Sequence, residues 1–188
     1  VHGRSSGLDP AAAMAARGVV FRSGVITETI DIARRGALLD ARWILADVGT
    51  APPTAVAIAA ANVARTRLGA AATSRLVSAV DNATLNAARA LAAGDLGLLA
   101  ASMRVCDEAL EQLDVMDDRM RAARAVGLGA GALAMKQTGA GLGGCMLALA
   151  PNARITETVT AQLARSGIAA VTVRVTARRA PPDSETTQ

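Results

Sequence analysis

One glycine-rich loop constrains the fold of this chain more than any other stretch. Residues 136–145 read KQTGAGLGGC, and apolar, strand-like runs flank the loop at 132–135 and 145–150. Glycine lacks a Cβ and readily adopts positive φ angles, so such a loop lets a ligand or another backbone approach closely. Consecutive N–H groups in such a loop also form anion-binding nests. The alternative interpretation is a wide connection between two strands that binds nothing.

Two familiar nucleotide-binding motifs do not fit this loop. Gly139, Gly141 and Gly144 have the spacing G-x-G-x-x-G, but the dinucleotide fingerprint requires a helix directly after the loop. Here a second strand-like run follows, and the next helical pattern begins only after Pro151. Walker A requires a closing Gly-Lys-Ser/Thr, which the loop lacks. The sequence context therefore excludes both a Rossmann unit and a P-loop at this position.

The composition predicts a core of small aliphatic side chains. Of the 188 residues 52% are hydrophobic, yet the chain has one Phe, one Trp and no Tyr. A chain of this length buries a sizeable core. The net charge of +4 comes from scattered arginines, and without aromatic side chains to stack bases we expect no nucleic-acid partner.

The sequence also predicts a cytoplasmic protein without a membrane partner. No apolar run reaches the length of a membrane span, because arginine interrupts each one. No leader of the signal-peptide type is recognisable. The two cysteines, Cys106 and Cys145, give neither a disulfide framework nor a metal-ligand spacing, which favours a reducing compartment.

Hydrophobic periodicity predicts an α+β protein. Asp9 is expected to be the N-cap of a first helix with Pro10 at its first helical position, and Thr54 the N-cap of another. Strands are expected at 18–22, 42–47, 132–137, 145–150 and 169–176, and helices at 54–68, 73–93, 95–113, 117–126 and 154–165. We expect the last four strands to form one mostly antiparallel sheet packed against helices, with the long helices on one face.

Two motifs about 130 residues apart resemble those of one kinase superfamily. The segment His2-Gly3-x-x-Ser6-Gly7-Leu8-Asp9 resembles the HGxxSGxD segment of mevalonate kinases. The loop from Lys136 to Cys145 resembles the third glycine motif of the galactokinase, homoserine, mevalonate and phosphomevalonate kinase superfamily. The resemblance covers nearly all of residues 1–177 and implies the C-terminal portion of a two-lobed small-molecule kinase.

The resemblance implies roles for individual residues. Asp9 matches the aspartate near the mevalonate hydroxyl, the proposed catalytic base; as structure alone, it is a helix cap. A free aspartate is a poor base at pH 7, so Asp9 could instead orient the hydroxyl, because phosphoryl transfer relies mostly on positioning. The residues that match the substrate pocket are His2, Gly3, Ser6 and Gly7. Those that match the loop supporting the phosphate site are Thr138, Gly139, Ala140, Gly141, Gly143 and Gly144.

The chain departs from the family pattern at several positions, among them Val48. Val48 stands where a threonine near the substrate is common. The family's lysine segment and Gly/Ser-rich phosphate loop precede the HG/SG/D motif, and this chain begins at that motif. We therefore expect residues 1–40 to be the end of an incomplete N-terminal lobe, with exposed apolar surface at 1–24. Residues 41–177 are expected to be the C-terminal lobe, and 178–188 a disordered tail.

The activity implied by the resemblance is transfer of the γ-phosphoryl group of ATP, with Mg²⁺, to the 5-hydroxyl of mevalonate. The isolated chain is expected to be inactive. A separate N-terminal half and a homodimer are possible partners. The alternatives are another kinase of the superfamily, acting on phosphomevalonate or a sugar, and a non-catalytic remnant that binds a partner or ligand.

Overall fold

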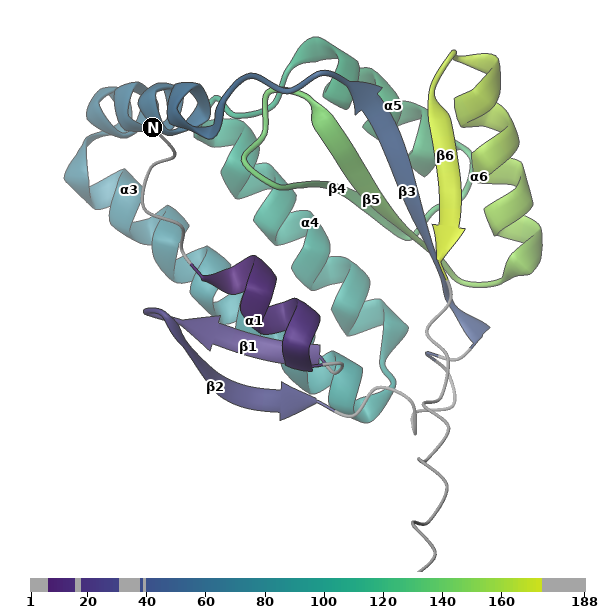
Figure 1. The fold of residues 1–188 in the computed structure, drawn as a ribbon, viewed down its shortest axis with the longest axis horizontal. Coiled ribbons are helices and arrows are strands. Elements are labelled where there is room, and N and C mark those ends of the chain that lie inside the picture. The colour runs from purple at the N-terminus through teal and green to yellow at the C-terminus, as the bar shows by residue number, and fades with distance from the viewer. Residues whose placement is uncertain (1–6, 16–17, 31–37, 39, 174–188) are drawn as a thin grey trace, which may run out of the picture.

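A four-stranded antiparallel sheet organises the fold in the computed structural model, which describes residues 7–15, 18–30, 38 and 40–173 (Figure 1). β3 (Arg42–Gly49) lies in the middle of the sheet and pairs with both β5 (Gly144–Ala150) and β6 (Ala169–Val173). β4 (Ala134–Thr138) pairs with β5, which gives the order β4-β5-β3-β6. The structure thus confirms the predicted antiparallel sheet.

Helices pack on both faces of this sheet. Alternate residues of β3, namely Ile44, Ala46 and Val48, are buried against α5 (Asp118–Gly129) and α6 (Ala153–Arg165), because successive strand residues point to opposite faces. On the other face Leu149 packs with α4 (Leu96–Gln112) and the end of α3 (Thr54–Ala93). The long helices therefore cover one face as predicted, whereas α5 and α6 cover the face that the prediction left open.

The alanine-rich helix α3 has a break in its middle. Gly69 has φ 78° and ψ 166°, which are not helical, so the segment consists of two helices joined at this residue. The sequence predicted this division between 68 and 73. Beyond the break α3 runs beside α4 (Figure 1), and Ala90 is fully buried between them. Such small side chains let the two helices approach closely.

A small N-terminal unit packs on the far end of α3. It consists of α1 (Leu8–Ala15) and a hairpin of β1 (Gly18–Arg22) and β2 (Val25–Ile30). Val20 and Ile30 of the hairpin pack against Ala88 of α3. The sequence predicted β1 but missed β2, because five of its six residues are exposed and its polar residues resemble a loop.

Several predicted element ends are corrected by the structure. Helix α1 begins at Leu8, so Asp9 and Pro10 lie inside its first turn and Asp9 is not the N-cap. Thr54 is the first residue of α3; its N-cap is Pro53, and no side chain caps it. Asp95 and Asp117 do cap α4 and α5, each accepting a hydrogen bond from a backbone N–H. The predicted tail at 178–188 lies outside the described residues.

Candidate functional site

The glycine loop is the connection of the β4–β5 hairpin. Thr138 and Cys145 are the last paired residues of the two strands, so residues 139–144 form the connection. Five residues of the loop adopt positive φ angles, from 59° at Leu142 to 121° at Gly143. They are Gly139, Gly141, Leu142, Gly143 and Gly144. Because a strand and not a helix follows the loop, the structure confirms that it is not a Rossmann unit.

The second half of the loop is buried against two neighbouring turns. A Cβ on Gly141 would stand 2.2 Å from the carbonyl oxygen of Val115, in the turn between α4 and α5. A Cβ on Gly143 would stand 2.6 Å from the carbonyl oxygen of Thr50, in the turn between β3 and α3. The N–H of Leu142 donates to the Val115 carbonyl at 2.8 Å. The packing of protein against protein therefore explains why these two positions are glycine.

The first half of the loop faces solvent. Thr138, Gly139 and Ala140 are exposed, and a Cβ on Gly139 would meet no atom within 4 Å. Gly139 nevertheless has φ of 84°, a conformation that side-chain-bearing residues rarely adopt. This exposed backbone is the part of the loop that is accessible to a ligand.

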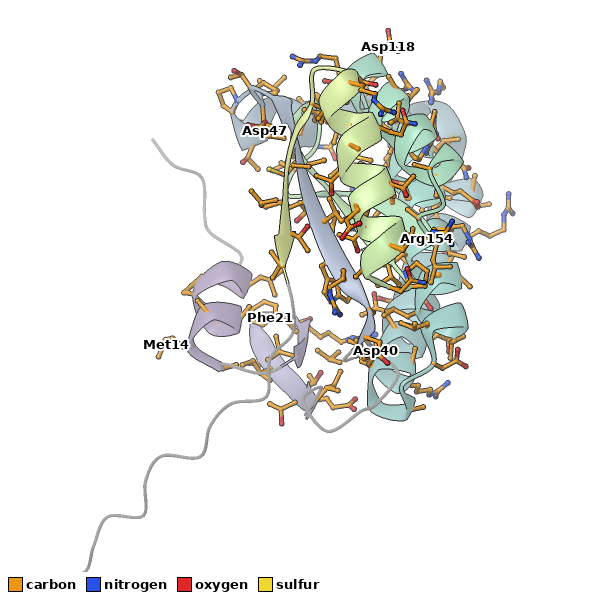
Figure 2. All side chains as sticks on the ribbon, turned by 90° about the vertical axis from the view of Figure 1, so that its right-hand side faces the viewer. Met14, Phe21, Asp40, Asp47, Asp118 and Arg154 are labelled. Carbon is orange, nitrogen blue, oxygen red and sulfur yellow. The ribbon has the colours of Figure 1, made fainter. Side chains whose placement is uncertain are left out.

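The C-terminal end of β3 lies beside the loop. The carboxylate Oδ1 of Asp47 accepts a hydrogen bond from the N–H of Gly49 at 2.8 Å, and Gly49 pairs with Gly144. The guanidinium of Arg119, on α5, packs against Gly49, since a Cβ there would be 2.6 Å from its Nη1. Figure 2 shows Asp47 at the opposite end of the molecule from Phe21 of the hairpin. One carboxylate and one guanidinium thus border the loop.

The side chain of Val48 is buried. It is 1% exposed and belongs to the core between the sheet and α5 and α6. Packing therefore accounts for an apolar residue at this position.

A buried ion pair holds α4 and α5 together beneath the loop. Oδ2 of Asp107, whose side chain is 4% exposed, lies 2.7 Å from Nη1 of Arg124. Oδ1 of Asp107 accepts the backbone N–H of Gln137 at 3.3 Å, just before the loop begins. Arg124 also pairs with Glu111 at 2.7 Å, and its hydrogen bond holds the pKa of Glu111 below the ordinary value. This arrangement ties two helices to the end of β4.

Lys136 is a structural residue at the start of the motif. Its Nζ donates to the carbonyl oxygen of Gln137 at 2.5 Å. Burial lowers the pKa of Lys136, and the neighbouring Cys106 and Asp107 act in the opposite direction. The amine is therefore occupied by the protein and does not extend into the exposed part of the loop.

The residues predicted for the substrate pocket are only partly described. His2, Gly3 and Ser6 lie outside the described residues. Gly7 has φ of 81°, and its carbonyl accepts the first hydrogen bond of α1, from the N–H of Ala11 at 3.2 Å. Asp9 lies in the first turn of α1, and its side chain is not described. Its catalytic role and its position relative to the glycine loop stay predictions.

Two residues near the loop, Asp107 and Gln137, were not predicted from the sequence as part of the site. Asp107 follows Met103 by four positions and precedes Leu110 by three, so it lies on the apolar stripe of α4. Gln137 follows the buried Met135 by two positions and therefore points to the same buried face of β4. A polar residue at a buried position of a periodic pattern is the signal that identifies both, because buried polar groups require partners.

The described residues contain no group of three or more His, Cys, Asp or Glu side chains arranged to hold a metal ion. Within the same part of the chain, no helix combines the length and hydrophobicity of a membrane span. Both cysteines, Cys106 and Cys145, are free thiols.

Comparison with known proteins gives a family match for part of the chain. Residues 87–169, from the end of α3 to the start of β6, match the family described as GHMP kinases C terminal. This segment contains the glycine hairpin, and the match confirms the predicted resemblance to the superfamily. No curated protein matches the chain.

Solved structures show the same fold over most of the chain. L. major mevalonate kinase in complex with R-mevalonate is 23% identical with a TM-score of 0.76, over 94% of this chain and 55% of that one. Streptococcus pneumoniae phosphomevalonate kinase in complex with phosphomevalonate and AMPPNP is 17% identical with a TM-score of 0.65, over 82% and 44%. Lactococcus lactis galactokinase complexed with galactose is 17% identical with a TM-score of 0.59, over 85% and 50%.

The chain thus spans about half the length of the kinases it resembles. At these identities the likeness establishes the fold and leaves the substrate open.

Proposed function

We propose that this chain is the C-terminal portion of a mevalonate kinase-like small-molecule kinase. The reaction is transfer of the γ-phosphoryl group of ATP to the 5-hydroxyl of mevalonate. The observation that supports it most is the glycine hairpin, which lies within the segment that matches the GHMP kinase family and whose exposed half lies beside the end of β3. The agreement with L. major mevalonate kinase over 94% of the chain favours mevalonate among the possible substrates.

The described residues would form one wall of a site for ATP and Mg²⁺, and not a complete site. The exposed backbone at Gly139, with open space above it, suits the close approach of a phosphate-binding segment or of the nucleotide. Mg²⁺ is usually held by one or two carboxylates together with substrate phosphates, and Asp47 is the carboxylate nearest in the sheet to the loop. When bound, Mg²⁺ would neutralise charge on the transferring phosphoryl group.

In this proposal the loop acts as a support. Its buried glycines let the β4–β5 hairpin contact the turns at Thr50 and Val115, and this contact fixes the exposed backbone at Gly139 and Ala140. Phosphoryl transfer depends mainly on such positioning, together with charge stabilisation. Asp9 would orient the mevalonate hydroxyl, with His2, Gly3, Ser6 and Gly7 shaping the pocket around it.

The chain needs a complementary N-terminal lobe to be active, either from the same gene product or from a separate polypeptide. The exposed apolar side chains of α1 and β2 are consistent with such a contact: Met14 is 85% exposed and Val25 59%. Alone, the 188-residue chain should show no mevalonate-dependent ATP turnover above background. Appreciable turnover by the purified chain would mean that the phosphate site lies elsewhere.

The decisive experiment measures turnover after a related N-terminal lobe has been added. Mevalonate, phosphomevalonate and galactose are offered separately, and mevalonate should be preferred. Asp9→Asn should then reduce kcat by at least about 100-fold, the range of general acid–base and positioning effects, while Tm stays nearly unchanged. The matched control, Asp118→Asn, changes an aspartate with a 99% exposed side chain and should leave turnover as it was.

Other outcomes identify the alternatives. Preference for phosphomevalonate or galactose would assign another kinase of the superfamily. Absence of turnover with all three substrates would favour a non-catalytic remnant. Near-normal turnover of Asp9→Asn would show that Asp9 serves α1 and not the chemistry.

A further inference from the structure

The side chain of Gln137 is a buried amide without hydrogen-bond partners. Gln137 is the second residue of the loop motif, lies on β4 and is 1% exposed. Neither Nε2 nor Oε1 has a hydrogen-bond partner. Its backbone, in contrast, is fully engaged, because the N–H donates to Asp107 and the carbonyl accepts from Lys136. The unsatisfied groups are therefore confined to the side chain.

This amide lies directly beneath the glycine loop. Its Nε2 is 2.8 Å from the point where a Cβ of Gly141 would stand. The same point is 2.2 Å from the carbonyl oxygen of Val115, so the amide, Gly141 and the α4–α5 turn meet in one place. The loop backbone at Gly141 and the carbonyl oxygen of Val115 are therefore both close to the Gln137 amide.

The loop, in turn, has a weakly bonded donor. The N–H of Gly143, a buried residue, donates to the thioether sulfur of Met120 at 3.3 Å. Methionine sulfur is a weak acceptor. An amide oxygen would be a better partner for a loop N–H, and the positive-φ glycines at 139, 141 and 143 give the backbone freedom to turn.

We propose that Gln137 is a positioning residue that latches a second arrangement of the glycine loop. In that arrangement Oε1 accepts a backbone N–H of residues 141–143, and Nε2 donates to a loop carbonyl. The second arrangement is a minor state in the free chain, at roughly 0.1–10%. The inference rests on the proposed function only in treating the loop as part of the active site.

The latch explains why a polar side chain occupies a core position. An apolar residue of similar shape would avoid leaving a donor and an acceptor unpaired, at no loss to the resident fold. The competing explanation is a buried water that bridges the amide to the backbone. The two explanations predict different dynamics.

The test uses NMR relaxation dispersion on the full 188-residue chain, without ligand. Backbone amides of residues 139–144 should show microsecond-to-millisecond exchange. Gln137→Met removes both amide groups and keeps the volume, so the exchange should be lost while Tm stays equal or rises. Gln137→Leu serves as a second variant if the Gln137→Met protein does not fold. The matched control is Gln162→Met on α6, an exposed glutamine, which should leave loop exchange intact.

Each other result overturns the latch. Exchange that persists in Gln137→Met assigns the motion to the glycines alone, and absence of exchange in the wild type removes the second arrangement. A lower Tm in Gln137→Met shows that the amide has a partner in the resident fold, and a crystal structure with a water bridging the amide names that partner. None of these results depends on turnover, so failure of the latch and failure of the kinase proposal are distinguishable.

Discussion

At the scale of single residues, the glycines of the loop have different physical roles. Gly141 and Gly143 are glycine because backbone carbonyls occupy the space of a Cβ. Gly139 has open space around it and is favoured only by its positive φ. The motif is therefore partly a packing motif, and only its exposed part is available for binding.

This difference predicts unequal costs for alanine at two positions of the same loop. Gly139→Ala should lower the free energy of unfolding by about 1 kcal/mol, because alanine is strained in the left-handed conformation. Gly141→Ala should cost about 1–3 kcal/mol more, because the methyl group meets the Val115 carbonyl at 2.2 Å and the turn must shift. Urea unfolding of both variants measures the difference. Equal losses of stability in the two variants would mean that the turn at Val115 shifts to make room for the methyl group without an energetic cost.

At the scale of elements, Asp107 is the residue that joins α4, α5 and β4. Its carboxylate contacts Arg124 on α5 and the N–H of Gln137 on β4. Such a buried pair contributes little net stability, but removing one partner leaves an uncompensated charge. The pair therefore determines how the helices sit against the hairpin.

Removing the cation alone should be the most damaging change to this pair. Arg124→Met should cost about 3–5 kcal/mol, because Asp107 remains buried at 4% side-chain exposure. The double variant Asp107→Asn/Arg124→Met should recover most of that loss. The control is Arg121→Met, which breaks the ion pairs of an arginine whose side chain is 41% exposed. This change should lower the free energy of unfolding by at most about 1 kcal/mol. A double-mutant cycle, measured by urea unfolding, gives the coupling energy between Asp107 and Arg124. Strictly additive losses of stability would contradict the proposed coupling.

At the scale of the whole molecule, the chain has a strong centre and a weakly held N-terminal unit. The sheet is buried on one face by α5 and α6 and partly on the other by α3 and α4. The β1–β2 hairpin contributes only Val20 and Ile30 to a small cluster on α3, and Figure 2 shows Met14 of α1 pointing away from the rest of the molecule. The assignment of residues 1–40 to an incomplete lobe remains a prediction.

Native-state hydrogen exchange should resolve these two parts. A two-stranded hairpin is marginally stable by itself, so amides of β1 and β2 should exchange through local opening. Those of β3 and β5 should exchange at least about tenfold more slowly, a difference of about 1.4 kcal/mol or more in opening free energy. Addition of a complementary N-terminal lobe should protect the hairpin. Equal protection in the isolated chain would show that the unit folds together with the sheet.

The sequence alone determined the elements and the class of the loop. The strand-like run at 42–47 predicted β3, and the helical patterns at 95–113 and 117–126 predicted α4 and α5. Strand-like runs on both sides made the glycine motif a strand connection. These features depend on neighbours in the chain, so they are visible without a fold. β2 was missed because its exposed, polar residues carry no such pattern.

Only the tertiary structure decided what surrounds the loop. Gly141 meets Val115, Asp107 meets Arg124 and Gln137 lies without a side-chain partner, because segments 17 to 30 residues apart converge there. Local sequence patterns do not encode that convergence. Burial of Val48 likewise depends on the helices that cover its face of the sheet. The loop was readable from the sequence, but the division between its packing half and its exposed half arises from contacts that only the folded chain makes.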